Sequence, residues 1–558
     1  MPIRYGSAPR RFQSTWDTTQ DGSNNDQVVL PLVNGGSYDF NIDWGDGKTT
    51  RNNITTYNQA EVTHTYDETG IYEIRIVGGI TGWQFNNQGD DDKILTISSW
   101  GPMVMVNDEF IFFGCSNLES TATDSLILDN TMREMFRSVV NLGDQGNMND
   151  WDTSSVTDMR SIFNNATGFN QPVGGWNTSN VTTMQGIFTA ENGGMIFDQD
   201  IGSWDVSNVT NMEQMFRKSH FVTNGRVNLF NNGGSSSISG WNTSKVTNMF
   251  GMFEDCSQFN QPIGTWDVSK VTNMDRMFAE AVLFDQDLSN WDVSGVTNMA
   301  YMFRATAFTN GGSDGITGWD TSSVTTMRYM FLSCDEFNIP IGSWNTSSVT
   351  NMEGMFQNAT GFNQPLSGWN TSNVTDMGAM FYKEGGGMTF DQDIGNWDVS
   401  NVIDMQDMFA MNANVTNAQR PYFNNGGSSS ISGWNTGKVT NFNGMFEGNT
   451  GINQPIGAWD TSSATDIGNM FFKATAFDQD LSNWVVTGVT SATQFLKTNS
   501  LSTTNYDLTL SGWAQQSGDL QAGVSIDFGT SQYSIATGEQ YKEILSGAGW
   551  TIVDGGSV

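Results

Sequence analysis

The sequence predicts a repeat solenoid, preceded by a small all-β domain and closed by a C-terminal cap. Two observations predict the solenoid: tryptophans recur at steps of 25, 28 or 37 residues, and a block of these steps returns 193 residues later. Such self-similarity is typical of units that bury their apolar faces by stacking on their neighbours. A third observation, four strand-like runs bounded by glycine and aspartate before residue 81, predicts the all-β domain.

The tryptophans form a ladder along most of the chain, and we expect their indoles to make up its buried structural core. A linear stack of this kind is not expected to contain the deep pocket that is typical of an enzyme. The ladder consists of Trp151, Trp176, Trp204, Trp241, Trp266, Trp291, Trp319, Trp344, Trp369, Trp397, Trp434, Trp459 and Trp484.

One repeat, residues 259–283, illustrates the expected unit. Trp266 lies in a short extended run, in which side chains alternate between two faces. Met274, Met277 and Phe278 follow at the spacing that places side chains on one face of a helix. The pattern therefore predicts a short strand, a turn, a short helix and a return loop in each repeat.

A longer period is superimposed on the repeats. Five tryptophans within residues 176–291 have counterparts 193 residues later, which indicates that a block of seven repeats was duplicated. The longest repeats carry Gly/Ser-rich insertions at matching places, residues 217–240 and 410–433. Because such loops tolerate change and often bind partners, we expect both insertions to emerge on the same side of the stack and to be dispensable for folding.

The repeat reads Trp-Asp-Val-Ser-x-Val-Thr-x-Met-x-x-Met-Phe, and the pattern extends from about residue 95 to about residue 500. It resembles the BspA-like leucine-rich repeat family of bacterial surface proteins. The resemblance implies a leucine-rich-repeat-like solenoid, with a short strand plus a short helix per coil, on an extracellular recognition protein without catalytic residues. Ala464 and Val485 depart from the pattern near its end.

The segment before the repeats has a different character. Its Trp44-Gly45-Asp46-Gly47 turn, followed by His64-Thr65-Tyr66, resembles the PKD-type β-sandwich, which implies a spacer or an adhesive unit. The polar N-terminus, with Arg4, Arg10 and Arg11, is expected to be either a docking arm or a frayed end. The predicted organisation is an arm at 1–26, a PKD-like sandwich at 27–80, a transition with an N-terminal cap at 81–125, the solenoid at 126–500 and a C-terminal cap at 501–558.

Composition narrows the possible partners. A net charge of −35 opposes a nucleic-acid role, which needs a basic face. We find no stretch apolar enough to span a bilayer, and the first residues lack the apolar core of a signal peptide. Three cysteines give no disulfide framework, and Cys256 and Cys334 stand where other repeats have alanine, so we expect both to be small core residues.

The acidic residues suggest one cation site. Asp267, Asp292 and Asp320 follow tryptophan in three consecutive repeats, where stacked carboxylates about 5 Å apart would repel one another. A Ca²⁺ ion at this column is one interpretation, and no other cofactor is expected. The alternative is structural: elsewhere Asn-Gln-Pro segments alternate with Asp-Gln-Asp segments, which reduces the repulsion without a metal.

We expect a non-enzymatic protein, because no catalytic set can be assembled from the two histidines, His64 and His220. One hypothesis is a surface recognition protein, such as a phage fibre, a receptor-binding component or a bacterial adhesin. The other is a capsid- or tail-decorating structural protein. The missing export signal favours a virion component. The expected partners are a protein or glycan on a cell surface, or other virion proteins bound through the N-terminal segment, and neither nucleic acid nor a membrane.

Overall fold

The computed structural model describes residues 10–48, 52–101, 103–105, 109–191, 193–218, 228–385, 387–412 and 422–558. The chain divides into two compact units, Met1–Val271 with Met277–Gln286, and Thr272–Arg276 with Asp287–Val558.

The α-helices among the described residues are α1 (Thr503–Ala514) and α2 (Gly538–Gly547). The strands are β1 (Phe12–Asp17), β2 (Gln27–Val29), β3 (Tyr38–Asp43), β4 (Asn52–Ile54), β5 (Thr63–Thr65), β6 (Ile71–Ile80), β7 (Ile94–Ser99), β8 (Val104–Met105), β9 (Glu119–Ser120), β10 (Ile127–Leu128), β11 (Ser525–Asp527) and β12 (Thr551–Val553). The 3-10 helices are η1 (Ala60–Val62), η2 (Met148–Asp150), η3 (Asn232–Gly234), η4 (Ser236–Gly240), η5 (Asn310–Gly312), η6 (Gly315–Gly318), η7 (Ile341–Ser343), η8 (Asn425–Gly427), η9 (Ser430–Gly433) and η10 (Ile456–Ala458).

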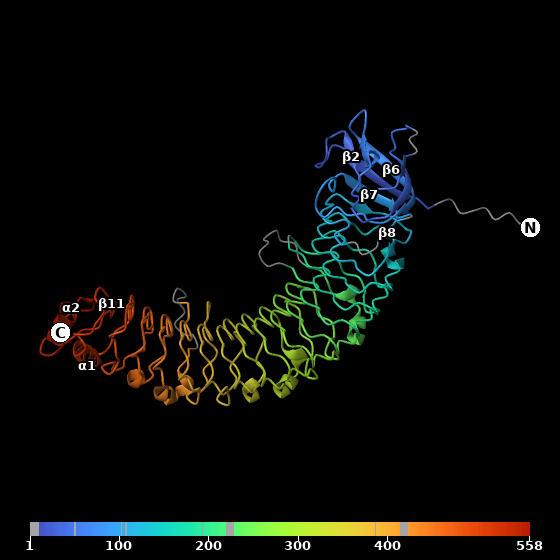
Figure 1. Ribbon diagram of the computed structural model, residues 1–558. Helices are drawn as coiled ribbons and strands as arrows, with labels where there is room; N and C mark the ends of the chain where they lie inside the picture. The colour runs from blue at the N-terminus through green and yellow to red at the C-terminus, as the bar shows by residue number, and fades with distance from the viewer. Residues whose placement is uncertain are drawn as a thin grey trace, which may run out of the picture. The chain divides into compact units, whose positions relative to one another are not determined.

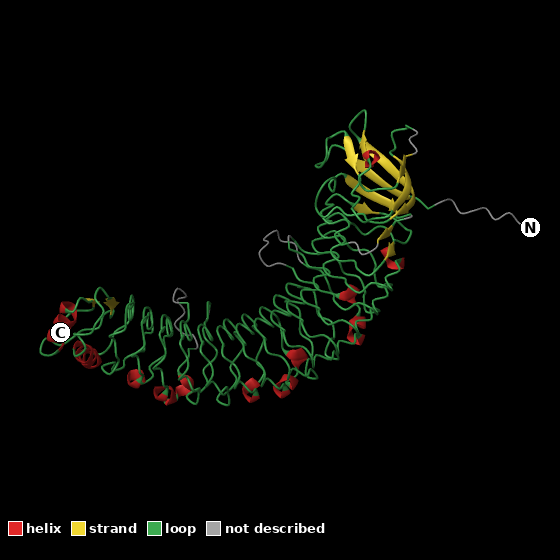
Figure 2. Ribbon diagram, in the orientation of Figure 1, coloured by secondary structure: helices red, strands yellow, loops and turns green. Residues whose placement is uncertain are grey.

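The first unit begins with a six-stranded sheet in the order β4-β3-β6-β1-β7-β9, drawn in blue in Figure 1 and in yellow in Figure 2. Neighbouring strands are antiparallel except β7 and β9, which are parallel. Strand β1 lies between β6 and β7, and its alternation buries Phe12 and Trp16. Within the predicted N-terminal arm, Phe12–Asp17 therefore form an inner strand of the sheet, and residues 1–9, with Arg4, lie outside the described residues.

A buried lysine fixes the segment that joins β1 to β2. The ammonium group of Lys93 donates hydrogen bonds to the backbone carbonyls of Ser23, Asn24 and Gln27 at 2.9–3.0 Å. It lies 3.7 Å from the carboxylate of Asp90, and both side chains are fully buried. Because a buried charge is tolerated only when it is paired and hydrogen-bonded, this arrangement holds the N-terminal segment against the sheet.

The motif predicted as PKD-like brings four side chains together. The indole of Trp44 stacks on the ring of His64 with 4.9 Å between the centroids, and His64 Nε2 lies 2.9 Å from a carboxylate oxygen of Asp46. The hydroxyl of Tyr66 donates to the carbonyl of Trp44 at 3.0 Å. The two parts of the motif thus pack on each other: the Trp44 turn follows β3 of the six-stranded sheet, and His64 lies in β5, which pairs with β2 in a separate two-stranded sheet. Strands β1, β7 and β9 of the six-stranded sheet lie outside residues 27–80.

The predicted fold class, a leucine-rich-repeat-like solenoid with a short strand plus a short helix per coil, is wrong. In the described residues of 126–500, regular structure consists of β10, 3-10 helices of three to five residues and isolated parallel bridges. Both α-helices follow residue 500. The repeats are therefore built from turns and loops, shown in green in Figure 2, and the sheets of the protein are small.

A left-handed residue prevents the expected helix in each repeat. In the segment Met327–Phe331 the middle residue, Tyr329, has a φ of 53°, which a right-handed helix cannot accommodate. The N–H of Met330 instead bonds to the carbonyl of Met327 at 3.1 Å, which closes a turn. The two methionines and Phe331 still point inward, so the spacing that predicts a helix is produced by consecutive turns.

Backbone hydrogen bonds run between repeats instead of along a helix. Along this segment, alternate backbone N–H groups donate to carbonyls of the next repeat, and the N–H groups between them close turns within their own repeat. Each repeat therefore relies on its neighbour to satisfy its backbone hydrogen bonds. The N–H groups of Met327, Tyr329 and Phe331 donate to the carbonyls of Asn351, Glu353 and Met355, respectively, at 2.8–3.1 Å. Within each unit, Figure 1 shows successive repeats side by side.

Aromatic rings fill the interior of the repeats. In the second unit Phe331 stacks on Phe337 of its own repeat, with 3.8 Å between the centroids, and on Phe356 of the next repeat at 5.8 Å. Trp319 and Trp344 stack at 5.9 Å. All thirteen tryptophans of the ladder are at most 5% exposed, so they lie in the core.

The C-terminal segment covers the last repeat of the second unit. The N–H of Leu496 donates to the carbonyl of Asp527 in β11 at 2.8 Å, and β11 pairs in parallel with β12. The indole N–H of Trp513, on α1, donates to the carbonyl of Leu481 at 2.9 Å. Residues 501–558 therefore satisfy backbone groups that the last repeat would otherwise expose.

Candidate binding surface

The three aspartates proposed for calcium each accept hydrogen bonds from their own turn. The backbone N–H groups of Ser269, Ser294 and Ser322 donate to Asp267, Asp292 and Asp320, respectively, at 3.0–3.1 Å. Hydrogen bonds from Ser269 lower the pKa of Asp267, and those from Ser322 lower the pKa of Asp320. Among the described residues, no group of three or more His, Cys, Asp or Glu side chains is placed to hold a metal ion. The calcium site stays a prediction, which a rise in melting temperature in millimolar Ca²⁺ would support.

The alternating asparagines and aspartates are joined by hydrogen bonds. The side-chain oxygen of Asn170 accepts the N–H of Asp198 at 3.0 Å and the side-chain amide of Gln199 at 3.0 Å. In turn, Asp198 accepts the N–H of Asn231 at 2.7 Å. These side chains connect successive repeats without a cation.

The described parts of the Gly/Ser-rich insertions combine exposed residues with buried ones that anchor them to the repeats. Asn232 is fully buried, and its side-chain oxygen accepts the N–H of Ile201 at 3.0 Å. Its amide donates to the carbonyl of Ser235 at 2.6 Å, and Asn425 repeats this pattern in the second unit. This burial argues against the expectation that the insertions are dispensable for folding. Residues 219–227 and 413–421, with His220, lie outside the described residues.

The cysteines lie in the core. Cys115, Cys256 and Cys334 form no disulfide bonds and are fully buried. Burial raises the pKa of the Cys115 and Cys256 thiols. Since the thiolate is the reactive form, these two side chains are expected to be inert.

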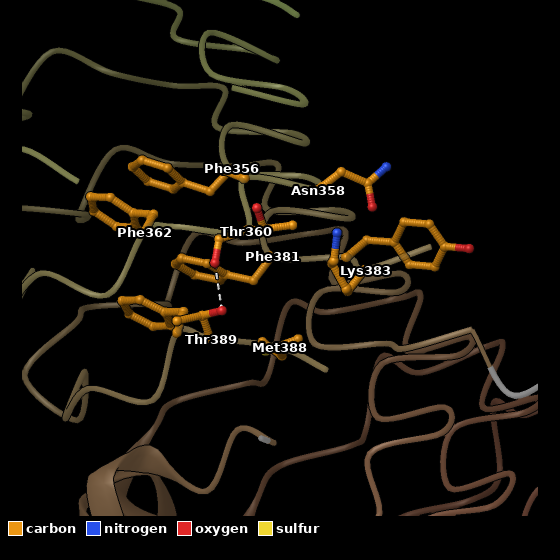
Figure 3. A pocket seen from close by; sticks show the side chains of 11 residues that line it. Phe356, Asn358, Thr360, Phe362, Phe381, Lys383, Met388 and Thr389 are labelled. Atoms are coloured by element: carbon orange, nitrogen blue, oxygen red, sulfur yellow. Dashed lines mark hydrogen bonds between the residues drawn. The ribbon is translucent and has the colours of Figure 1, made fainter. Parts of the chain in front are cut away.

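A small cavity lies between the phenylalanine columns of the second unit. Figure 3 shows it between the rings of Phe356, Phe362 and Phe381, with Thr389 donating to the carbonyl of Thr360 at 2.6 Å. The cavity has a volume of about 10 Å³, which is enough for about one water molecule. It therefore cannot hold a ligand.

The left-handed turn positions of the second unit carry a ladder of large side chains. The guanidinium of Arg276 lies 4.5 Å from the ring centre of Tyr301, and the rings of Tyr301 and Tyr329 stack at 5.0 Å. Arg328 lies 5.0 Å from the ring centre of Tyr329 and 2.7 Å from a carboxylate oxygen of Glu353. The hydroxyl of Tyr329 donates to Glu353 at 2.6 Å, so this ring is held on several sides.

A groove begins where this ladder ends. The next two left-handed positions are Gly354 and Ala379, with φ values of 59° and 52°, and Gly378 adds a third small residue. The ring of Tyr329 lies directly over Gly354. A Cβ atom added to Gly354 would come within 2.0 Å of the ring, so this position has no room for a side chain. Beyond Tyr329 the small residues leave a groove of about 320 Å³.

The far side of the groove carries carboxylates and amides. Asp376 accepts the N–H of Gly378 at 3.0 Å, Asp404 accepts the N–H of Gln406 at 2.8 Å, and Asp407 accepts the side-chain amide of Gln406 at 3.2 Å. Burial raises the pKa of Asp376 and of Asp407, and the nearby charge of Asp404 adds to both effects. Tyr382 and Gln357 also line the groove.

A second groove, in the first unit, has a volume of about 480 Å³ and a lining of acidic, amide and hydroxyl side chains. Burial raises the pKa of Asp91 to about 6, and the charge of Asp92 contributes. Asp92 itself accepts the hydroxyl of Ser116 at 2.6 Å. This groove has no aromatic lining residue among those described.

The groove residues of the second unit were not among the residues predicted from the sequence. A signal was available, because the residue before the second methionine of each repeat changes from Tyr301 and Tyr329 to Gly354 and Ala379 and then to Asp407. That signal becomes interpretable only once the turn is known to point this residue outward.

Comparisons with known proteins identify the repeats. No curated protein and no solved structure matches the chain. Among the described residues, helices are too short or too polar to cross a membrane. A family model described as "Mycoplasma protein of unknown function, DUF285" matches four successive segments, residues 130–233, 227–314, 306–423 and 414–513, which together span more than half of the chain. The chain therefore belongs to the DUF285 family.

Proposed function

We propose that the chain is a non-enzymatic recognition protein, displayed on the surface of a virion or a cell, that binds its partner through exposed side chains of its repeats. One observation carries this proposal: the repeats keep their core positions and vary the turn positions that face away from the core. The inward positions Met327, Met352 and Met377 are identical and fully buried. The turn positions two residues later are Tyr329 and Ala379, which are half-buried, and Gly354, which the ring of Tyr329 covers.

This division is typical of proteins that use repeated frames to present binding surfaces. Constant apolar side chains maintain the stacking, whereas varied exposed side chains contribute little to it and can serve recognition. In the second unit, the stacked side chains of Arg276, Tyr301 and Tyr329 lie next to an acidic groove. Neighbouring parts of this surface therefore differ in charge and in aromatic character. The surface thus has the variety that selective binding requires.

The origin of the repeats supports display on a surface. We propose that the repeats of this chain are related to the BspA-like repeats of bacterial surface proteins, because their Trp-Asp-Val-Ser-x-Val-Thr-x-Met-x-x-Met-Phe pattern resembles that family. The Trp44–Asp46 turn packed on His64 supports a PKD-like spacer in front of them. A virion component remains part of the proposal, as does an adhesin on a cell.

The test measures saturable binding of the fluorescently labelled full chain to a panel of intact bacterial and animal cells. A variant with Tyr301→Ala, Tyr329→Ala and Asp407→Ala removes three half-buried side chains that lie outside the apolar core, and circular dichroism checks that it folds. Saturable binding that this variant loses supports the proposal. Binding that the variant keeps in full, or the absence of saturable binding with incorporation into virus particles, would contradict it and indicate a structural role.

A further inference from the structure

We propose that the groove between Tyr329 and Asp407 binds a neutral oligosaccharide. The inference rests on the proposed recognition function and adds the ligand class at one site of the surface. The groove, with its volume of about 320 Å³, falls at the lower end of the roughly 300–1,000 Å³ found for small-ligand sites. It is thus large enough for a compact ligand, unlike the water-sized cavity between the phenylalanine columns.

The aromatic side of the groove is rigid before any ligand arrives. Tyr329 is stacked on Tyr301, approached by the guanidinium of Arg328 and fixed through its hydroxyl to Glu353. A tyrosine held in this way offers apolar area and a polar edge with little further loss of conformational freedom. Tyr382 adds a second phenol to the lining. The apolar C–H face of a sugar ring is suited to such side chains, which are amphipathic themselves.

The polar side of the groove matches sugar hydroxyls. Carboxylate oxygens of Asp376, Asp404 and Asp407 accept hydrogen bonds, and their orientation is set by the donors that they already hold. The side-chain amides of Gln357 and Gln406 can both donate and accept. A hydroxyl group also does both, so a polyol can use the whole lining.

The charge of the groove selects among sugars. Four carboxylates, those of Glu353, Asp376, Asp404 and Asp407, line it, and no lysine or arginine is among its described lining residues. A sialylated or sulfated ligand would be repelled by these charges. A basic peptide would be attracted to the four carboxylates. An ammonium group, however, would neither bond to the side-chain amides nor fill the volume of the groove. The mixed lining therefore favours a neutral polyol over a point charge.

The repeats supply a substitution that fills the groove without a new backbone demand. Ala379 has a φ of 52°, and tyrosine is already present at the equivalent position with nearly the same angle, 53° at Tyr329. Ala379→Tyr would continue the tyrosine ladder across the groove. The matched control is Asn469→Tyr, at the equivalent position outside the groove, where φ is 55°.

A second pair of variants removes one charge. Asp404→Asn introduces an asparagine into the groove. Asparagine is already present at the same bridge position of other repeats, as Asn351 and Asn441. Asp466→Asn makes the same change in the same column outside the groove. Both variants keep the side-chain oxygen that accepts the turn N–H, so both are expected to fold.

The experiment titrates the full chain by calorimetry with neutral tetrasaccharides of glucose, mannose, galactose and N-acetylglucosamine, with a sialylated tetrasaccharide and with tetralysine. We expect at least one neutral tetrasaccharide to bind and the sialylated one to bind more weakly. Ala379→Tyr should weaken the neutral ligand at least tenfold, and Asp404→Asn several-fold. Asn469→Tyr and Asp466→Asn should leave the affinity unchanged.

Three outcomes would overturn the inference: no neutral tetrasaccharide binds, Ala379→Tyr binds as the unaltered chain does, or only tetralysine binds and depends on Asp404. If cell binding persists in any of these cases, the recognition function stands and only the ligand class is wrong. Release of reducing sugar from a bound tetrasaccharide would contradict the non-enzymatic part of the proposed function while leaving the ligand class correct.

Discussion

The indole N–H of Trp266 donates a hydrogen bond to the backbone carbonyl of Ile238, 28 residues earlier, at 2.8 Å. The same relationship joins Trp344 to Ile316 at 2.9 Å within the second unit. Each of these tryptophans therefore fills the core of its own repeat and also satisfies a buried acceptor of the preceding repeat. At these two positions one side chain combines apolar packing with a hydrogen bond to the backbone.

Replacing Trp266 separates the two contributions. Trp266→Ala leaves a large cavity and removes one of the two hydrogen bonds to the Ile238 carbonyl, which keeps the N–H of Trp241. We expect a loss of about 3–5 kcal/mol in the free energy of unfolding. Trp266→Phe keeps most of the packing and loses the hydrogen bond, at a cost of about 1–3 kcal/mol. Urea unfolding of the three proteins measures both values. Equal stability of the alanine variant and the unaltered chain would contradict this account.

Lys93 gives a second prediction, on the N-terminal sheet. Lys93→Met leaves Asp90 as a buried unpaired carboxylate and removes the donor to three backbone carbonyls, so we expect a loss of about 3–5 kcal/mol. Combining it with Asp90→Asn removes the unpaired charge and should recover part of that loss. Thermal unfolding followed by tryptophan fluorescence provides the comparison. A double variant less stable than Lys93→Met alone would show that the charge pair is not the cause.

Asp91 predicts a pH dependence. Burial raises the pKa of its carboxyl from 3.8 to about 6, so the folded state holds this proton more tightly than the unfolded state does. The stability it contributes is fully present below pH 3.8 and is lost as the pH rises through about 6. A shift of this size corresponds to about 3 kcal/mol, which partial exposure reduces to roughly 1–2 kcal/mol. Relative to Asp91→Asn, the unaltered chain should lose that amount between pH 4 and pH 7, as measured by urea unfolding at each pH. Parallel profiles for the two proteins would refute the assignment.

The buried asparagines of the Gly/Ser-rich segments predict a structural cost. Asn232→Ala leaves the N–H of Ile201 without its acceptor, and we expect a loss of about 1–3 kcal/mol. Asn425→Ala, which affects the N–H of Ile394 in the second unit, should cost a similar amount. Ser236→Ala, at an exposed neighbouring position, is the control and should change stability by less than about 0.5 kcal/mol. Unchanged unfolding of both asparagine variants would restore the view that these segments are free loops.

The sequence predicts burial more reliably than it predicts backbone conformation. Apolar residues recur at fixed spacing because they pack, and this is why the tryptophans and the methionine–phenylalanine pairs could be assigned to the core. The helix was predicted wrongly because consecutive turns place Met327, Met330 and Phe331 at the same spacing. Left-handed residues usually signal such turns through glycine, but here glycine is present in some repeats only, such as Gly354, and others hold Tyr329, Ala379 or Asp407.

The candidate site could not be predicted, because the sequence does not show in which direction the side chain at the left-handed turn position points. The turn directs the side chain at the left-handed position outward. The size of that side chain decides whether the stack of Arg276, Tyr301 and Tyr329 continues or a groove forms. Tyr329, Asp404 and Asp407 are separated by intervals that match no motif of known chemistry. Their proximity follows from repeat stacking alone, so they could be grouped only after the register of the repeats was known.

The hydrogen bonds from each repeat to the next also determine where the structure stops. Donors such as the N–H of Tyr329 need an acceptor further along the chain, and the last of the series, at Leu496, finds it in β11. Without residues 524–558 that row of donors would be an open edge. The C-terminal segment thus shields this edge, and its removal should leave the last repeat with unpaired donors that promote association.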